Sequence, residues 1–355
     1  MRISNEREVW NIFLARDEAR IKTTDPWNRI LYADRIASEV NQPVVSEYLF
    51  KNGFRPHYPG KKNFAVCISH DVDHLFQPGL SAYGRVKGAS KNFFNGRWKK
   101  TLQYLDPESR INPNYNLEDL LDIETKLGIP STFYFLALQP GEKDYNYSLA
   151  DIKPLLQTIG KRGFEVALHG GHEAYQNADK LEQERKELQE NSPSTVSGYR
   201  NHFLRFHVPV TWENLGKAGF NYDSTYGFPD HPGFRNGMCY PFFPYNVNNQ
   251  RFSEILEIPL LAMDATFIFY LKYDVHKSLQ LIKEIIDKTR AVNGVFTLLW
   301  HNNYLYKPWK QAFHSVISYC KDSGAWFATG EHLNQWWREN NFCGDYRRCG
   351  LREEL

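Results

Sequence analysis

The sequence lacks any run of about 18 apolar residues, the minimum for a membrane-spanning helix. The start of the chain carries charges where a secretory signal would have its apolar core, so we expect a cytoplasmic protein. Cysteine is scarce: five residues without the paired spacing of a zinc site favour reduced thiols over a disulfide framework. The formal net charge is only +2 over 355 residues, so no nucleic-acid partner is expected.

The composition that remains is that of a folded globular protein, with 42% hydrophobic and 24% charged residues. Three parts are expected: an N-terminal extension over residues 1–60, a main domain over 61–340 and a C-terminal tail over 341–355. The extension is expected to be mostly helical, with helices near residues 5–20 and 27–40. The second would begin at Asp25-Pro26, because proline favours the first turn of a helix.

Short runs rich in β-forming residues alternate with helix-like segments along the main domain. Helices are expected over residues 117–127, 151–161 and 210–218, where apolar residues recur at helical spacing. Strands separated by helices pair in parallel, so we predict an α/β fold, an irregular (β/α) barrel of seven or eight mainly parallel strands. The expected strands are residues 64–69, 131–137, 164–168, 195–199, 220–223, 255–259, 295–300 and 326–329.

Polar residues suited to catalysis follow five of these strands. The C-terminal ends of the strands of a (β/α) barrel meet at one face, where the chemistry takes place. Carboxylates and imidazoles together are the usual ligands of zinc or a similar cation in a catalytic site. We therefore predict a metal-dependent hydrolase site at this face. The residues are His70, Asp71, Asp73 and His74; His169, His172 and Glu173; Arg200 and His202; Asp223; and His301.

Five segments around these residues carry a resemblance to a known family. In chain order they resemble the five motifs of the polysaccharide deacetylases, carbohydrate esterase family four. The His-Asp-Val-Asp-His pattern of the first segment is most similar to a subgroup found with bacterial surface-polysaccharide enzymes. The segments are residues 69–73, 168–173, 198–203, 222–224 and 298–301.

The resemblance implies a reaction and a role for several residues. Asp71 would be the general base, Arg200 would orient it, and His301 would be the general acid for the leaving amine. Asp223, in the fourth segment, would contact the substrate. The implied reaction removes N-acetyl groups from an amino sugar of a bacterial polysaccharide or its precursor, so the expected partner is a carbohydrate.

The resemblance also implies a divalent metal bound by Asp73 and His169, with zinc first and cobalt, nickel or iron as alternatives. The third ligand stays open. The family has a second histidine four residues after the first, but here Glu173 holds that position and His172 comes one residue earlier. His202 stands where the family usually has proline. We rank His172 first, His202 second and Glu173 third.

Two other departures from the family pattern concern the first motif and two insertions. Val72 separates two aspartates that are usually adjacent, yet alternate residues of an extended segment point the same way. Residues 75–113 form one insertion, which would be a lid or a substrate wall. Residues 226–245 form the other, whose Phe234, Phe242 and Phe243 would either stack on sugars or pack within the loop.

Three alternative functions fit the same residues. The site could remove O-acetyl groups from a sugar ester, because the chemistry differs only in the leaving group. The altered second motif could instead mark a non-catalytic carbohydrate-binding protein on a degenerate deacetylase fold. Two carboxylates such as Asp71 and Asp223 could also hydrolyse a glycosidic bond, but this function leaves the histidines unexplained.

Overall fold

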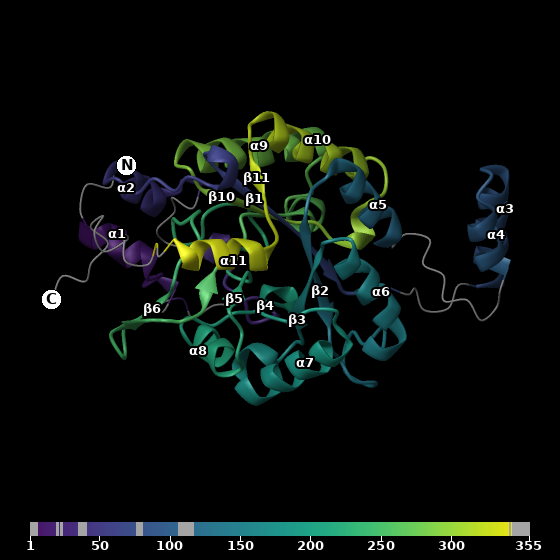
Figure 1. Cartoon of the computed structure of the whole chain (residues 1–355), viewed down its shortest axis with the longest axis horizontal. Coiled ribbons are helices and arrows are strands. Elements are labelled where there is room, and N and C mark those ends of the chain that lie inside the picture. The colour runs from purple at the N-terminus through teal and green to yellow at the C-terminus, as the bar shows by residue number, and fades with distance from the viewer. Residues whose placement is uncertain are drawn as a thin grey trace.

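A curved sheet of parallel strands forms the centre of the molecule, as the computed structural model in Figure 1 shows. The structure describes residues 6–18, 21, 24–34, 41–75, 81–105, 117–340 and 342, and within these ranges the sheet has nine strands. Eight follow the order β8-β5-β4-β3-β2-β1-β10-β9, and β11 pairs with the start of β1. The strands are β1 Ala65–Val72, β2 Ser131–Leu136, β3 Glu165–Gly170, β4 Gly198–Asn201, β5 Tyr222–Asp223, β8 Leu256–Glu257, β9 Ala262–Met263, β10 Val295–Leu299 and β11 Trp326–Phe327.

This sheet confirms the predicted α/β fold and its parallel strands, and all eight predicted strands take part in it. Strand β9 is additional to those predicted. In the described part of the chain the end strands β8 and β9 do not pair with each other, so the barrel is open. A separate antiparallel pair consists of β6 (Tyr245–Asn246) and β7 (Arg251–Phe252).

Two strands extend beyond their apolar segments. Strand β1 continues past Ser69 to Val72 because its backbone stays paired with β2, with Asp71 opposite Tyr134. Strand β4 likewise includes Arg200, opposite His169 of β3. His70, Asp71 and Arg200, which we expected after these strands, therefore lie within them, whereas Asp73 and His202 directly follow the strand ends.

Helices surround the sheet in Figure 1. In the ranges that the structure describes, no helix combines the length and the apolar character that crossing a membrane requires. The helices are α1 Glu6–Phe13, α2 Val44–Lys51, α3 Ala82–Phe94, α4 Trp98–Leu105, α5 Leu117–Leu127, α6 Leu149–Lys161, α7 Ala178–Asn191, α8 Val210–Lys217, α9 Val275–Ala291, α10 Trp309–Asp322 and α11 Gly330–Glu339. The shorter turns are η2 Tyr32–Asp34, η3 Pro59–Lys61, η4 Ala174–Gln176, η5 His202–Leu204, the π-helical η6 Thr266–Tyr270 and η7 Asn302–Tyr304.

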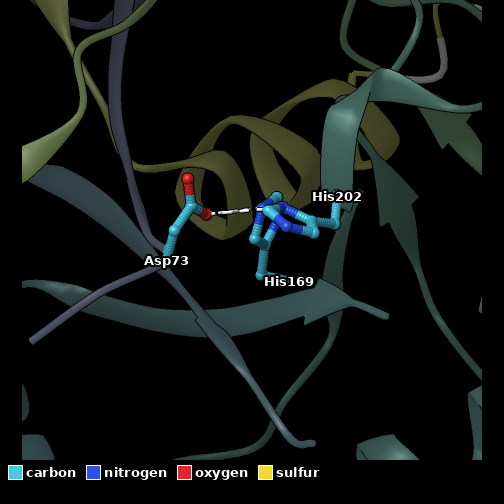
Figure 2. Close-up of side chains that lie close together, drawn as sticks. All are labelled: Asp73, His169 and His202. Atoms are coloured by element: carbon cyan, nitrogen blue, oxygen red, sulfur yellow. Dashed lines mark hydrogen bonds and ion pairs between the residues drawn. The ribbon is translucent and has the colours of Figure 1, made fainter. Parts of the chain in front are cut away.

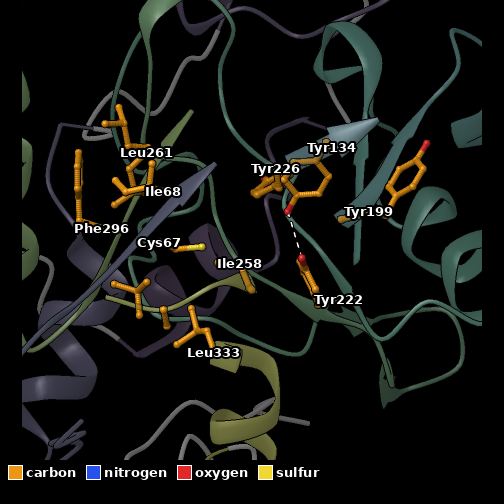
Figure 3. Packing of buried hydrophobic residues seen from close by; sticks show 14 of the residues in the cluster. Cys67, Ile68, Tyr134, Tyr199, Tyr222, Tyr226, Ile258, Leu261, Phe296 and Leu333 are labelled. Atoms are coloured by element: carbon orange, nitrogen blue, oxygen red, sulfur yellow. Dashed lines mark hydrogen bonds between the residues drawn. The ribbon is translucent and has the colours of Figure 1, made fainter. Parts of the chain in front are cut away.

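The central strands are buried along their whole length. Every residue of β1, β2 and β10 is buried, as expected for parallel strands that are covered on both faces. Figure 3 shows part of this core, in which Cys67 and Ile68 of β1 belong to the same cluster as Phe296 of β10. The hydroxyl groups of Tyr134 and Tyr222 lie 3.4 Å apart and join β2 to β5 by a hydrogen bond (Figure 3).

The cysteines in the described ranges are buried thiols. Cys67, Cys239 and Cys320 are free, and burial raises the pKa of each to about 12. These thiols are therefore neutral at ordinary pH and inert as nucleophiles. Cys343 and Cys349 lie outside the described residues, as does most of the predicted C-terminal tail.

The N-terminal extension differs from its prediction. The first helix is shorter than expected, and the second is wrong over residues 27–34, which form a turn followed by η2; residues 35–40 lie outside the described ranges. The Asp25 carboxylate accepts hydrogen bonds from the backbone N–H groups of Trp27 and Arg29 and from the Arg29 guanidinium. Asp25-Pro26 therefore starts a tight turn closed by side-chain bonds, which compete with the helix.

Candidate active site

Five of the predicted site residues line one pocket at the C-terminal ends of the strands. Asp71 and Asp73 come from the end of β1, His169 from β3, and His202 directly follows β4. His301 follows β10, one residue beyond Trp300. Arg200 of β4 lies outside the pocket lining and contacts Asp71, which belongs to the lining. The pocket has a volume of about 300 Å³ and is lined by Arg29, Asp71, Asp73, His169, His202, Phe203, Leu204, Met263, Ala265, Phe269, Tyr270, His301 and Tyr304.

Asp73, His169 and His202 converge on one point, as Figure 2 shows. His169 Nε2 lies 3.1 Å from Asp73 Oδ1 and 3.1 Å from His202 Nδ1. The third side of this triangle, from His202 Nδ1 to Asp73 Oδ1, is 3.5 Å. Ligand atoms around a tetrahedral zinc ion with bonds of about 2.0–2.2 Å lie about 3.3–3.6 Å apart. The triangle therefore has the size that one zinc-like cation requires.

The surroundings of this triangle also fit a cation. Asp73 Oδ1 is buried and has no hydrogen bond of good geometry. Each histidine donates its other ring N–H outward: His169 Nδ1 to the Arg200 carbonyl at 3.0 Å, and His202 Nε2 to Asp144 Oδ2 at 3.2 Å. These bonds point the lone pairs of His169 Nε2 and His202 Nδ1 inward, the arrangement that supports metal-binding histidines in proteins.

The ionisation of the three residues favours cation binding. Burial alone would raise the pKa of Asp73, but His202 and His169 more than offset this, and its pKa lies well below the usual range. Burial lowers the pKa of His202, so its imidazole is neutral near pH 7. Burial also acts to lower the pKa of His169, but Asp71 and Asp73 raise it on balance, so a proton competes with a cation there.

Arg200 fixes Asp71 on the side away from the triangle. The buried guanidinium donates from Nη1 to Asp71 Oδ1 at 3.0 Å and to Ser69 Oγ at 2.7 Å. It also donates to the Ser224 carbonyl and hydroxyl at 2.8 and 3.0 Å. Asp71 Oδ2 lies 3.7 Å from His169 Nε2, so this oxygen stands beside the candidate cation position.

His301 is paired with an aspartate that our sequence reasoning missed. His301 Nδ1 donates to Asp264 Oδ1 at 2.7 Å, and the His301 backbone N–H donates to Asp264 Oδ2 at 2.7 Å. Burial lowers the pKa of His301, but Asp264 and then Asp73 and Asp71 raise it to about 9. Its Nε2 lies 3.8 Å from Asp73 Oδ2. Asp264 directly follows β9. In the sequence, the signal that could have revealed it is an aspartate at the end of an apolar run.

Several solved structures share this arrangement of strands and helices. The chain is similar to a protein from Mycobacterium smegmatis with a provisional assignment as a polysaccharide deacetylase, with 18% identity over 81% of this chain and 94% of that chain and a TM-score of 0.54. The chain has the polysaccharide deacetylase fold. Neither a protein-family model nor a curated protein matches its sequence.

Two further solved structures, one of a deacetylase and one of a pseudoenzyme, are less similar to this chain. One is the catalytic domain of a peptidoglycan N-acetylglucosamine deacetylase from Eubacterium rectale, with 13% identity, coverage of 79% of this chain and 93% of that chain, and a TM-score of 0.37. The other is a family 4 pseudoenzyme from Bacillus anthracis, with 12% identity, coverage of 78% and 66%, and a TM-score of 0.40.

Within this deacetylase fold, the predicted site residues His172, Glu173 and Asp223 lie outside the pocket lining and pair elsewhere. His172 pairs with Asp144 at 2.7 Å, and Glu173 pairs with Arg205 at 2.6 Å. Asp223 is fully buried beside Glu257, its partner in the β5–β8 ladder. Burial raises the pKa of Asp223 to about 6, and burial next to Asp223 raises that of Glu257 well above its usual range.

His70 and the glycines near His169 have structural roles. His70 points away from the pocket, as alternation along β1 requires, and its ring bonds the Trp300 carbonyl at 2.6 Å and Glu124 at 2.9 Å. A Cβ atom on Gly170 would come within 2.1 Å of the Tyr199 hydroxyl. Gly170 therefore makes room for a protein side chain.

The N-terminal extension contributes a wall of the pocket, which the sequence did not suggest. Arg29 Nη1 donates to the Phe203 carbonyl at 3.0 Å, and Trp27 stacks on the Phe203 ring at 4.4 Å. Phe203 and Leu204 have positive φ angles of 62° and 54°, a conformation that costs about 1–3 kcal/mol per residue. Arg29 and Trp27 hold this strained turn, which directly follows His202.

Aromatic residues at the pocket come from segments other than the two insertions. Phe234, Phe242 and Phe243 of residues 226–245 are buried in the core, so packing within the protein accounts for them. The described part of residues 75–113 contributes no residue to the pocket lining. The exposed rings at the pocket are instead Phe269 and Tyr270 of η6, with Tyr304 of η7 at 5.4 Å from Phe269.

Proposed function

We propose that the protein is a metal-dependent deacetylase that removes N-acetyl groups from an amino sugar of a bacterial polysaccharide or its precursor. The observation that carries this proposal is the triangle of Asp73, His169 and His202 with Asp71 and His301 beside it in one pocket. The polysaccharide deacetylase fold supports it. In this proposal His202, and not His172, is the third metal ligand.

The residues around the triangle supply the remaining chemistry. A divalent cation, zinc or a similar ion, would polarise the acetamide carbonyl and lower the pKa of the attacking water. Asp71 Oδ2 takes a proton from this water as the water oxygen bonds to the carbonyl carbon. His301, protonated near neutral pH because its pKa is about 9, gives a proton to the nitrogen. The C–N bond then breaks, which releases acetate and leaves a free amine on the sugar.

The shape of the pocket favours a small part of a glycan. Its volume of about 300 Å³ is at the lower end of the range for ligand sites, enough for about one sugar unit. Phe269, Tyr270 and Tyr304 offer aromatic faces against which a sugar ring can stack. Our prediction of a cytoplasmic location would make a lipid-linked or nucleotide-linked precursor the accessible substrate.

The pairing of His301 with Asp264 favours an amide over an ester. An amine leaves poorly unless it is protonated, and Asp264 keeps His301 in the protonated form that can do this. Acetate release from matched acetamido and acetoxy sugars, in the parent protein and in His301→Ala, distinguishes the two reactions. An O-deacetylase would keep most of its activity without His301. Glycoside hydrolysis by Asp71 and Asp223 lacks support, because Asp223 does not line the pocket.

The decisive test separates the base from the ligands. Asp71→Asn should lower acetate release from an N-acetylated sugar by at least about 100-fold, the contribution of a general base. Metal content, measured by atomic emission, should stay that of the parent, because Asp71 is outside the triangle. Asp73→Asn is the matched control, which should lose the metal as well as the activity. Parent-like turnover by Asp71→Asn would show that the proposed mechanism is wrong.

A further inference from the structure

The helices α3 and α4 form a hairpin with an exposed apolar surface. Figure 1 shows the pair at one side of the molecule, beyond α5. Seven large hydrophobic side chains on the hairpin are 47–84% exposed, more than a folded protein leaves open on one element without a partner. They are Tyr83, Val86, Phe93 and Phe94 on α3, and Trp98, Leu102 and Leu105 on α4.

These side chains form a stripe on each helix, which we call the apolar stripe. On α3 the intervals from Tyr83 to Val86 and from Val86 to Phe93 are three and seven residues, which returns to the same side of a helix. On α4 the interval from Trp98 to Leu102 is four residues, and Leu105 follows three later. Each helix therefore presents one continuous apolar side.

The seam between the two helices includes one pair from the apolar stripe, the rings of Phe93 and Trp98 at 4.8 Å. Ala89 and Tyr104 are buried against each other, and a Cβ atom on Gly88 would come within 2.0 Å of the Tyr104 ring. The hairpin thus closes on Gly88, Ala89 and Tyr104, and Lys100 pairs with Asp119 of α5 at 3.3 Å. Among the residues that the structure describes, the other five side chains of the apolar stripe stay 59–84% exposed.

The hairpin is also strongly basic. Residues 81–105 contain six lysine or arginine residues and no aspartate or glutamate, whereas the whole chain has a net charge of only +2. The basic residues are Arg85, Lys87, Lys91, Arg97, Lys99 and Lys100. Apolar and aromatic side chains flanked by cations are the composition of helices that lie on an anionic bilayer.

We propose that the α3–α4 hairpin docks the protein on an anionic lipid bilayer, with the apolar stripe in the interface. A second copy of the chain is a poorer partner, because two hairpins with six cations each repel one another. Nucleic acid would match the charge but offers no apolar surface to Val86, Leu102 and Leu105. This inference goes beyond the proposed function, because it concerns where the protein acts and does not depend on its reaction.

The place of the hairpin in the chain connects docking with the pocket. It comes between β1 and α5 in the chain, and its Lys100 pairs with Asp119 in the first turn of α5. The N-terminal end of such a crossover helix lies at the C-terminal ends of the parallel strands. A bilayer bound by the hairpin would therefore lie on the side of the protein from which the pocket residues emerge. Such docking suits a substrate that is anchored in the bilayer.

Vesicle flotation of the full-length protein tests the proposal. The parent should float with vesicles of phosphatidylcholine and phosphatidylglycerol at low salt, and float much less at high salt or with phosphatidylcholine alone. The stripe variant Val86→Ser/Phe94→Ser/Leu102→Ser should bind at least about tenfold more weakly. The charge variant Lys87→Gln/Lys91→Gln should lower partitioning by about 30-fold, since each basic residue contributes about 1 kcal/mol.

Matched controls carry the same changes elsewhere. Val247→Ser/Tyr306→Ser removes two other exposed hydrophobic side chains, 44% and 46% exposed, and Lys161→Gln/Lys217→Gln removes two exposed charges; both should float like the parent. Turnover of a soluble acetylated sugar should be unchanged in every variant, which keeps this test separate from that of the reaction. A parent that does not float, or a stripe variant that floats equally well, overturns the proposal. So does a stripe-dependent dimer, or RNA binding, without vesicle binding.

Discussion

The two ring nitrogens of His202 contact different groups. Its Nδ1 faces Asp73 and His169, and its Nε2 donates to Asp144, which His172 also contacts. The hydrogen bonds from His202 and His172 lower the pKa of Asp144, so this carboxylate stays ionised and holds the His202 ring in place. Asp144 would therefore act as the outer partner of a metal ligand.

Removing the charge of Asp144 tests this role. We expect Asp144→Asn to weaken metal binding by about 10–100-fold, because an amide holds the imidazole less firmly and polarises it less. Titration of the metal-free protein with zinc against a competing chelator gives the affinity. Asp322→Asn, at an exposed aspartate on α10, is the control and should match the parent. Unchanged affinity in Asp144→Asn would mean that His202 needs no outer partner.

Asp264 should set the alkaline limit of activity. The protonated form of His301 is the acid, so kcat/KM falls as the pH rises through the pKa of His301, which is about 9. A cation bound at Asp73 would neutralise part of the negative charge that raises the pKa of His301. The alkaline limit of activity is therefore expected at or below pH 9. Asp264→Asn removes the largest raising contribution, so the limit should move to lower pH. A pH profile of kcat/KM measures it, and an unmoved limit would exclude His301 as the acid.

At the scale of elements, a buried carboxylate of α5 links this helix to two strands of the sheet. Glu124 Oε1 lies 2.9 Å from His70 Nε2 of β1, and Oε2 accepts from the Ser131 hydroxyl of β2 at 2.6 Å. All three side chains are fully buried. The pair of His70 and Glu124 therefore supports the strand that carries Asp71 and Asp73.

Glu124→Ala should lower the free energy of unfolding by about 3 kcal/mol, because it leaves two buried polar groups without a partner. Guanidinium unfolding followed by circular dichroism measures the change. Glu118→Ala changes an exposed glutamate in the first turn of the same helix and should alter stability by less than about 0.5 kcal/mol. Equal values for the two variants would show that Glu124 does not anchor α5.

Element boundaries were harder to predict than the elements themselves. The apolar run of β1 ends at Ser69, but pairing with β2 carries the strand through Asp71 and Val72. Such pairing depends on a segment about 60 residues away in the chain, which local pattern does not reveal. The predicted helix after Pro26 was wrong because the Asp25 side chain satisfies the backbone of a turn instead.

At the scale of the whole molecule, the N-terminal extension is joined to the main domain by a buried ion pair. The Arg235 guanidinium donates from Nε and Nη2 to the two oxygens of Glu18 at 2.8 Å each. Tyr226 also donates its hydroxyl to Glu18 at 3.0 Å. The extension is thus fixed to residues 226–245, and from there it reaches the pocket through Arg29.

Breaking this pair should destabilise the protein strongly. Glu18→Ala removes the carboxylate that neutralises the buried Arg235 guanidinium, for which we expect a loss of about 3–5 kcal/mol. Thermal unfolding together with a denaturant titration measures the loss. Glu8→Ala, at an exposed glutamate of α1, is the matched control. A small effect of Glu18→Ala would mean that the extension contributes little to the stability of the whole.

The sequence by itself determined where eight of the strands lie along the chain and which polar segments follow five of them, because buried parallel strands are continuous apolar runs and their C-terminal ends share one face. Only the tertiary structure decided that His202 lies against Asp73 and His169, that Asp264 meets His301, and that Arg29 lines the pocket. Each of these contacts joins segments that are distant in the chain. Their distances depend on how strands, turns and the N-terminal extension pack together, and residue spacing in a sequence carries no such information.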